Sequence, residues 1–178
     1  MSTADDVKSK GLEHYGAGRF EEAIAAFAQA QQVFLTQGDM VQAAECANNR
    51  GVAARQATRL DESEAAFTDA RQLFEKLGDR KSQGMVVGNL GALAESRNQH
   101  DRAVAFYKEA LELFEAAGAA DLSAETWRAL SRTRMKQGQW FAALGAYDAS
   151  LDSVRHPSAV QRALHSLFRV SRRLMGSG

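Results

Sequence analysis

The sequence predicts an all-α protein: a right-handed α-solenoid of four helical hairpins, closed by a capping helix at the carboxyl end. Three observations lead to this prediction. Similar segments recur with a period of 40 residues, which is typical of stacked repeats. Proline occurs once in 178 residues, at Pro157, and strong helix formers dominate the composition. Turn residues separate the helical segments at regular intervals.

The repeat is clearest in three series of residues that each advance by 40 positions. A small residue recurs in the first helix of each hairpin, an aromatic residue recurs in the second helix, and a further apolar series follows it. Glycine costs about 1 kcal/mol in a helix interior, so its recurrence indicates a packing role. We expect the small residue to let the second helix approach and the aromatic ring to fill the space beside it. The series are Gly11, Gly51, Gly91 and Ser131; Phe27, Phe67, Tyr107 and Tyr147; and Phe34, Phe74, Phe114 and Val154.

Glycine and aspartate mark the boundaries between units. At Gly38-Asp39, Gly78-Asp79 and Gly118 to Asp121, a residue suited to ending a helix precedes one suited to capping the next. These signals make residues 1–175 one domain, with units at about 4–37, 38–77, 78–117 and 118–155. Residues 176–178 are interpreted as a disordered tail or a remnant of expression. The predicted helices lie near 4–16, 20–36, 40–56, 60–76, 80–96, 100–116, 121–137, 140–154 and 158–174.

The last predicted helix, residues 158–174, is amphipathic. Its apolar residues recur at helical spacing, and its basic residues lie mostly on the opposite side. An open solenoid needs an end helix with one apolar and one polar face, so we interpret this helix as a cap. Binding to an anionic membrane is the weaker interpretation. The apolar residues are Val160, Leu164, Leu167, Phe168 and Leu174, and the basic residues are Arg162, His165, Arg169, Arg172 and Arg173.

The pattern within each unit resembles the tetratricopeptide repeat. The resemblance covers about residues 4–154 and rests on the small residue, an alanine, the aromatic residue four positions after it and a further alanine three positions on. The usual terminal proline is missing from the first three units, and the period is 40 where the common repeat has about 34. We therefore expect longer helices. The alanines are Ala23, Ala103 and Ala143, and then Ala30, Ala70 and Ala110.

The longer repeat, with Asn49-Arg50-Gly51 and Asn89-Leu90-Gly91 in the first helices, resembles the repeats of the Leu-Gly-Asn polarity adaptors and kinesin light chains. In those families the asparagine lines the concave groove and hydrogen-bonds the backbone of an extended peptide. The resemblance therefore implies this role for Asn49 and Asn89. Ser9 and Ala129 stand at the same place in the outer units, which leaves at most two such asparagines. Hydrogen bonding within the solenoid or to water is the open alternative.

Residues one helical turn from these asparagines should share their face. Arg128 and Arg132 would make one end of the groove basic and suited to an acidic or carboxy-terminal segment, unless both are simply solvated. The resemblance does not extend to the clamp that grips the carboxylate tail of heat-shock chaperones, because Leu12, Met85 and Asn89 stand where that clamp needs other residues. The candidate groove residues are Lys8, Leu12, Tyr15, Asn48, Asn49, Val52, Arg55, Met85, Asn89, Arg128 and Arg132.

The sequence shows no pattern of residues typical of a catalytic or metal-binding site. The 22 Lys and Arg balance 22 Asp and Glu, so no net charge attracts nucleic acid or acidic membranes. The four histidines show no metal-ligand spacing with one another or with Cys46, which we interpret as a small core residue. We therefore expect no catalytic site, metal, cofactor or enzymatic activity. The charged start of the chain and its single cysteine predict a cytoplasmic protein without a membrane span.

Three functions are weighed. The first is a protein-interaction module whose concave groove binds a peptide segment of a partner. The second is a structural scaffold that self-assembles through the solenoid ends or the C-terminal helix; residues 120–178 carry nine Lys or Arg against four Asp or Glu, so the two ends differ in charge. RNA binding is third, because Glu45, Glu95 and Glu125 interrupt any basic inner surface.

Overall fold

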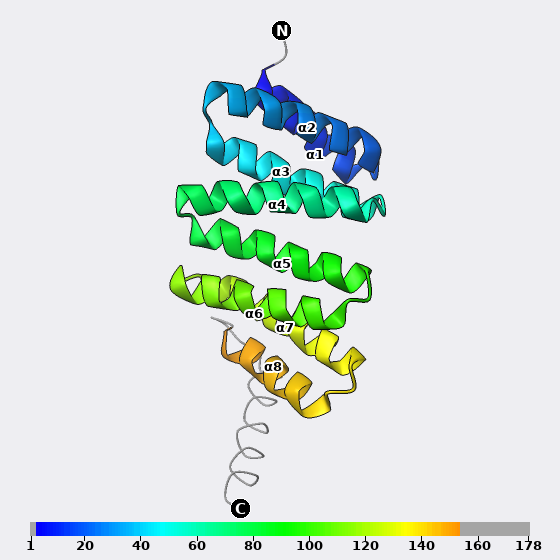
Figure 1. Ribbon diagram of the computed structural model, residues 1–178, viewed down its shortest axis with the longest axis vertical. Helices are drawn as coiled ribbons and strands as arrows, with labels where there is room; N and C mark the ends of the chain where they lie inside the picture. Colours follow the sequence, from blue (N-terminus) through cyan, green and yellow to red (C-terminus); the bar gives the residue numbers. More distant parts are fainter. Residues whose placement is uncertain (1–2, 154–178) are drawn as a thin grey trace, which may run out of the picture.

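The computed structural model describes residues 3–153, which form eight α-helices and no strand (Figure 1). Consecutive helices pair as four antiparallel hairpins that stack in chain order, so the predicted all-α solenoid is confirmed. The predicted helix at 158–174 and Val154 lie outside the described residues. The helices are α1 (Ala4–Gly16), α2 (Phe20–Gln37), α3 (Met40–Gln56), α4 (Leu60–Leu77), α5 (Arg80–Ser96), α6 (His100–Ala116), α7 (Ala120–Lys136) and α8 (Trp140–Asp152).

Two of the three unit boundaries follow the predicted glycine and aspartate chemistry. Gly38 and Gly78 have φ angles of 77° and 68°, in the left-handed region. The next residue in each case, Asp39 or Asp79, accepts a hydrogen bond from the backbone amide three positions on, at 3.1 Å and 3.0 Å respectively. These local signals explain why every described helix begins and ends within two residues of its predicted position.

The third boundary differs from the prediction. Gly118 is left-handed, with φ 64°, but α7 begins at Ala120 and its N-cap residue is Ala119, which has no side chain able to cap. Asp121 therefore lies within the first helical turn and does not cap the helix. There its charge still favours the positive end of the helix dipole.

Within each of the first three hairpins, a glycine lies directly against an aromatic ring, as predicted. A Cβ atom placed on Gly51 would lie 2.6 Å from the nearest ring atom of Phe67, and one on Gly91 would lie 2.6 Å from Tyr107. The corresponding distance from Gly11 to Phe27 is 2.7 Å. Such distances are too short for any side chain larger than hydrogen, so glycine sets the distance between the two helices. In the fourth hairpin Ser131 takes this place and donates a hydrogen bond to the Ala143 carbonyl at 2.7 Å.

The core consists of clusters of buried residues, several of which join neighbouring hairpins. Its central part combines Phe67 and Phe74 of α4 with Val86, Leu90 and Leu93 of α5, all at most 5% exposed. Small alanines of α3 complete this cluster and allow close packing. Because such clusters are shared between neighbouring hairpins, each hairpin is stabilised by the next one in the stack.

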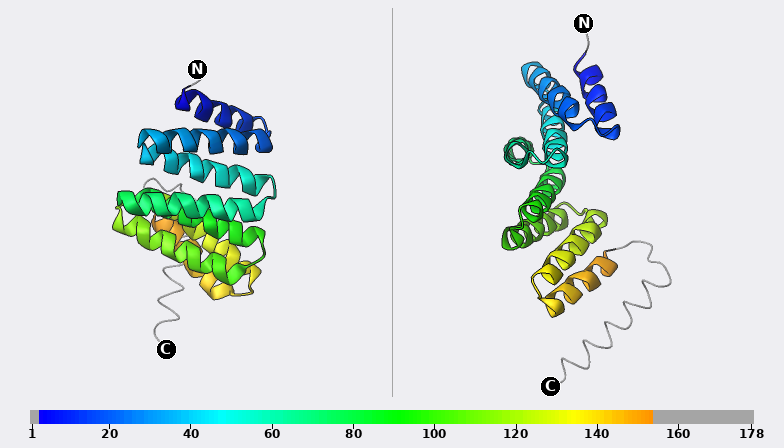
Figure 2. Two further views of the ribbon diagram at one scale, coloured as in Figure 1. Left: turned by 45° about the horizontal axis from the view of Figure 1, so that its top comes forward. Right: turned by 90° about the vertical axis from the view of Figure 1, so that its right-hand side faces the viewer.

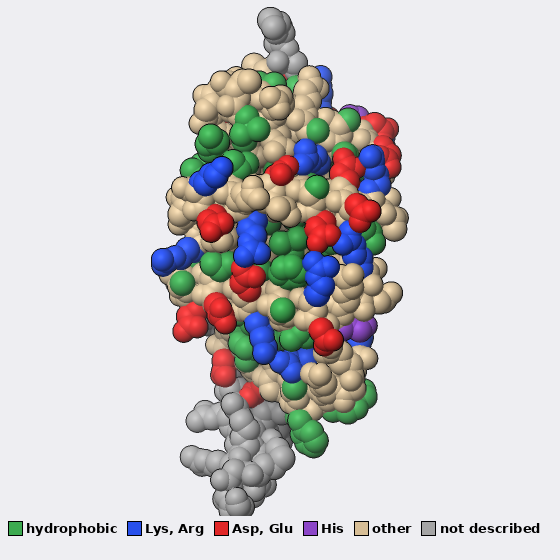
Figure 3. Space-filling view, viewed as in Figure 1, with side chains coloured by type: hydrophobic (Ala, Val, Ile, Leu, Met, Phe, Trp, Pro, Cys, Tyr) green, Lys and Arg blue, Asp and Glu red, His purple; other side chains and the backbone are tan. Residues whose placement is uncertain are grey.

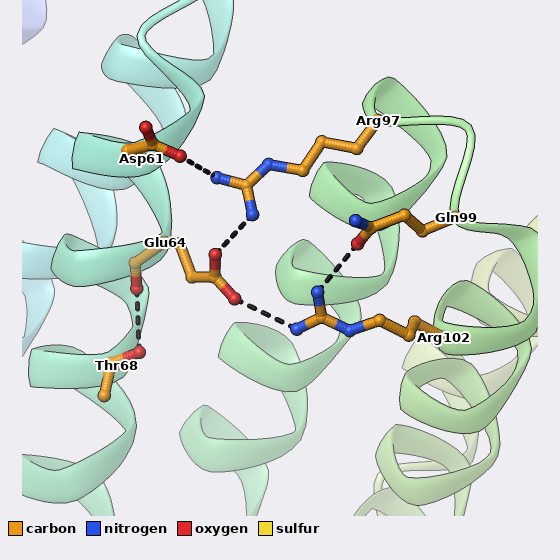
Figure 4. A network of polar contacts seen from close by, with 6 residues as sticks. All are labelled: Asp61, Glu64, Thr68, Arg97, Gln99 and Arg102. Carbon is orange, nitrogen blue, oxygen red and sulfur yellow. Dashed lines mark hydrogen bonds and ion pairs between the residues drawn. The ribbon is translucent and has the colours of Figure 1, made fainter.

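Neighbouring hairpins are also joined by a polar contact that recurs along the stack. The turn of each hairpin bonds the first turn of the second helix in the preceding hairpin. Figure 4 shows the central example, in which Arg97 bridges Asp61 and Glu64 while Arg102 also reaches Glu64. Pairs of this kind stabilise by at most about 1 kcal/mol each at an exposed site, so each contributes little to the stability of the stack. The three contacts are Arg59 with Glu21 at 2.7 Å, Arg97 with Asp61 at 2.5 Å, and Gln137 with Asp101 at 2.7 Å.

Candidate binding surface on the first helices

The first helices of the four hairpins, α1, α3, α5 and α7, form the surface that we call the first-helix face. In the right-hand view of Figure 2 the stack bends, with α1 and α7 toward one side and α4 toward the other. All eleven candidate groove residues belong to the first helices: three to α1, four to α3, two to α5 and two to α7. Each of them is half-buried or exposed, so none lies wholly within the core.

Two asparagines from different hairpins meet on this face. The Nδ2 of Asn89 on α5 donates to the Oδ1 of Asn48 on α3, with 2.9 Å between the atoms. Sequence reasoning gave Asn49 and Asn89 equivalent positions in their units, yet it is Asn48 that bonds Asn89. The bond fixes both amides and leaves the Nδ2 of Asn48 and the Oδ1 of Asn89 as a donor and an acceptor for a further partner.

A hollow of about 460 Å³ opens beside this asparagine pair. Phe74 and Val86 lie at its apolar base, and Met85, which is 45% exposed, forms part of its wall. The rim is polar and carries charges of both signs. The lining residues are Glu45, Asn48, Asn49, Phe74, Asp79, Lys81, Ser82, Met85 and Val86.

The N-terminal end of the face is tied to α3. The Nζ of Lys8 donates to the Oε1 of Gln42 at 2.6 Å and to the Oε2 of Glu45 at 2.5 Å. Lys8 therefore lies on the predicted face, but its charge is already neutralised by Glu45. Leu12 is 50% exposed, whereas the Tyr15 ring packs on Phe20 with 5.6 Å between the ring centroids.

Glu95 of α5 is the centre of a polar network that sequence reasoning did not find. Its carboxylate accepts hydrogen bonds from Tyr107 at 2.8 Å, from Thr133 at 2.9 Å and from Lys136 at 3.3 Å. Burial alone would raise the pKa of Glu95, but these three hydrogen bonds outweigh it and hold the pKa below its ordinary value. The donors come from α6 and α7, so the network ties the third hairpin to the fourth.

Arg128 and Arg132, the predicted basic end, differ in their surroundings. The guanidinium of Arg128 donates to Glu125 at 2.8 Å, one helical turn away. Arg132 is exposed, and none of the described residues forms an ion pair with it. Arg55 and Val52 on α3 are half-buried, and the Nε of Arg55 is buried with no hydrogen-bond partner among residues 3–153. Arg55, Arg132 and Lys81, which lines the hollow, are cations of this face that form no ion pair among the described residues.

No three His, Cys, Asp or Glu side chains lie together as metal ligands between residues 3 and 153. Cys46 is completely buried, as predicted, and burial raises the pKa of its thiol to about 11. Within the same range no helix has the length and apolar character needed to cross a bilayer.

Comparison with known proteins identifies the repeat. The family model of the tetratricopeptide repeat matches residues 42–116, which include α4, α5 and α6. The chain is a helical repeat protein of the tetratricopeptide type. No curated protein sequence matches it.

Solved structures share the fold of this tetratricopeptide-type protein at low sequence identity. BtubC (BKLC) from P. vanneervenii superposes with a TM-score of 0.75 and 19% identity over 87% of the chain. Aspartyl phosphate phosphatase F from Bacillus subtilis superposes with a TM-score of 0.80 and 14% identity over 84% of it. A Rap protein complexed with Competence and Sporulation Factor gives 0.76 and 15%, also over 84%. The chain spans 66%, 39% and 42% of these three structures, respectively. The repeat type is that of a protein-interaction module.

Proposed function

We propose that the first-helix face binds a short extended segment of a partner protein, with the Asn48–Asn89 pair as its centre. The observation that carries this proposal is the hydrogen bond between the two amides beside an open hollow. A peptide backbone offers one donor and one acceptor per residue. The free ends of the asparagine pair offer the complementary acceptor and donor, already held in place.

The hollow supplies the second element of recognition. Its base of Phe74 and Val86 is apolar, and the flexible side chain of Met85 can adapt to the shape of a bound side chain. Hydrogen bonds to the peptide backbone give affinity without regard to the sequence of the peptide. Specificity would then come from the peptide side chain that enters the hollow. We expect an apolar residue of moderate size to occupy it.

Arg55 and Arg132 favour a segment with negative charge. Neither guanidinium has a carboxylate partner among the described residues, whereas Lys8 and Arg128 are paired with Glu45 and Glu125. A carboxylate on the ligand would complete the hydrogen bonding of an arginine, which binds that group through two parallel N–H bonds. Binding should then weaken as salt concentration rises.

Similar folds are used for binding elsewhere, which supports the class of function. A Rap protein with this arrangement of helices is known in complex with Competence and Sporulation Factor. That likeness concerns the fold, and the residues proposed here come from this chain alone.

Selection of peptides from a displayed random library, followed by calorimetry, tests the proposal. The Asn48→Ala, Asn89→Ala double variant loses about two backbone hydrogen bonds of about 1 kcal/mol each, so affinity should fall about tenfold or more. The matched control is Gln29→Ala, Gln72→Ala, which removes two exposed amides from the second helices α2 and α4. Equal binding by the parent, the double variant and the control would exclude the first-helix face as the site.

A further inference from the structure

Helix α5 carries three glycines in its interior, and the packing of the stack explains two of them. A Cβ atom placed on Gly84 or on Gly91 would lie 2.8 Å or 2.6 Å, respectively, from an aromatic ring of α6. For Gly88 the nearest atom would be the Cβ of Ala110 at 4.0 Å, which is an ordinary van der Waals distance. Packing among the described residues therefore leaves room for a side chain at position 88.

Backbone conformation does not require glycine at position 88 either. Gly88 lies in the middle of α5, whereas every glycine with a positive φ angle among residues 3–153 lies in a turn between helices. A glycine in a helix interior destabilises the helix relative to alanine, because it loses more conformational freedom on folding. A residue that lowers stability without a structural reason is typical of a functional site.

Position 88 lies on the first-helix face, where the other first helices carry larger polar side chains. Gly88 directly precedes Asn89, whose amide bonds Asn48. The α5 backbone therefore lacks a side chain at a point next to the centre of the proposed site. The equivalent residues of α1, α3 and α7, which are half-buried like Gly88, are Lys8, Asn48 and Arg128.

The other side of the stack carries side chains of mixed charge. Figure 3 is viewed with α2 in front of α1 and α6 in front of α7, so it shows the side of the second helices. Lys and Arg side chains lie among Asp and Glu side chains over the middle of that side. Arg71 of α4 and Glu109 of α6, for example, form an ion pair at 2.5 Å. Some charges there are thus already paired with one another, whereas the amide pair on the first-helix face has a free donor and a free acceptor.

We infer, on the basis of the proposed function, that the main chain of the bound segment crosses α5 directly over Gly88 and comes closest to the stack there. An asparagine side chain is short, so a main chain that bonds Asn89 must lie close to the surface of α5. A side chain at position 88 would stand in its path. Glycine instead allows a ligand to approach the helix backbone closely.

The same geometry restricts which helices the segment can approach closely. At the equivalent positions of α1 and α7, the side chains of Lys8 and Arg128 would hold a main chain away from the helix. Lys8 is also fixed in place by its hydrogen bonds to Gln42 and Glu45. We therefore expect the segment to place its main chain over Gly88 and a neighbouring side chain in the hollow.

A substitution that raises stability and lowers affinity tests the inference. The probe is the peptide that binds the parent chain most tightly after selection from a displayed random library. Gly88→Ala should raise Tm by about 2–4 °C. In calorimetry it should weaken binding of this peptide by about tenfold, and Gly88→Leu should weaken it further.

The matched control is Gly145→Ala in α8. A Cβ atom on Gly145 would meet no described atom within 4 Å, and the position is exposed. Gly145→Ala should therefore raise Tm by a similar amount and leave the affinity for the selected peptide unchanged.

Three results would overturn the inference. Equal binding by the parent and Gly88→Ala, with weak binding by Asn48→Ala, Asn89→Ala, would mean that the segment does not pass over Gly88, and the proposed function would stand. Binding that falls in Gly88→Ala but no further in Gly88→Leu would indicate an effect of helix flexibility in place of contact. A lower Tm in Gly88→Ala would give the glycine a structural role.

A different result would count against the proposed function itself. If the Asn48→Ala, Asn89→Ala variant binds the selected peptide as tightly as the parent, or if no peptide is selected, the first-helix face is not the binding surface and this inference fails with it.

Discussion

Alanine substitutions at two glycines of α5 should have opposite effects on stability. Gly91 and Gly88 lie one helical turn apart, but their surroundings differ. A Cβ on Gly91 would lie 2.6 Å from the Tyr107 ring, whereas a Cβ on Gly88 would lie 4.0 Å from the nearest neighbour, Ala110. Tyr107 is 4% exposed and its hydroxyl is held by Glu95, so its ring has little room to move away.

Two contributions determine how each substitution changes the free energy of unfolding: the helix propensity of alanine and the contact of its Cβ with neighbouring atoms. Replacing glycine by alanine within a helix gains about 1 kcal/mol. This gain stands alone in Gly88→Ala, which should therefore be stabilised. In Gly91→Ala the forced movement of the ring costs about 1–3 kcal/mol, so after the same gain the variant should be destabilised by up to about 2 kcal/mol. For a chain of this length a separation of about 2 kcal/mol corresponds to roughly 4–8 °C in Tm.

Thermal and urea unfolding followed by circular dichroism measure this difference. Complete unfolding curves are needed, because stacked repeats can unfold in stages. A Tyr107→Leu background leaves more space beside position 91 and should reduce the penalty of Gly91→Ala. If Gly91→Ala is as stable as Gly88→Ala, the glycine series does not set the spacing of the helices.

Three further predictions concern groups within the stack. Tyr107→Phe removes a donor to Glu95 and should destabilise by about 1–2 kcal/mol in urea titrations. Because the pKa of Glu95 is lower in the folded chain, its contribution is present above its ordinary pKa of 4.5 and is lost as pH falls. The acid-side loss of stability should therefore be smaller in Tyr107→Phe; an unchanged pH profile would contradict this. Cys46, with its pKa raised to about 11, should resist thiol reagents at pH 8 in the folded chain and react fully in denaturant; rapid labelling of the folded chain would contradict its burial. Arg97→Ala breaks the contacts with Asp61 and Glu64 in Figure 4 and should cost about 1 kcal/mol at low salt, less at high salt; a salt-independent loss would point to packing instead.

The helices and their pairing could be predicted because their signals are local or periodic. Gly38-Asp39 and Gly78-Asp79 fix helix ends through backbone conformation and capping, which depend on neighbours in sequence. The glycine and aromatic series repeat every 40 residues, so one packing rule explains three hairpins. Asp121 shows the limit of such signals, since the alanine before α7 took the capping position instead.

For the candidate site, the sequence predicts which helix face its residues share but not which of them contact one another. Those contacts depend on how the helices of neighbouring hairpins are offset along their axes. Asn89 bonds Asn48, 41 positions earlier, although the repeat period is 40. Glu95 meets Tyr107 and Thr133 only once α5, α6 and α7 are placed side by side. The sequence shows that Phe141 stands 40 positions after Asp101, where an acidic residue would continue the polar contact that recurs between hairpins. It does not show that the Phe141 side chain is 83% exposed.

Site-specific photo-crosslinking in cells that produce the protein tests most directly whether the first-helix face is the binding surface. A photoreactive amino acid replaces Met85 on this face in one chain and Gln72 on α4 in another, both exposed positions. The chain with the photoreactive residue at Met85 should give an adduct with a segment of another protein, and the adduct should be lost in Asn48→Ala, Asn89→Ala. The chain with the photoreactive residue at Gln72 should give none. Adducts with a partner from Gln72 alone, or adducts from Met85 that survive the double substitution, would contradict it.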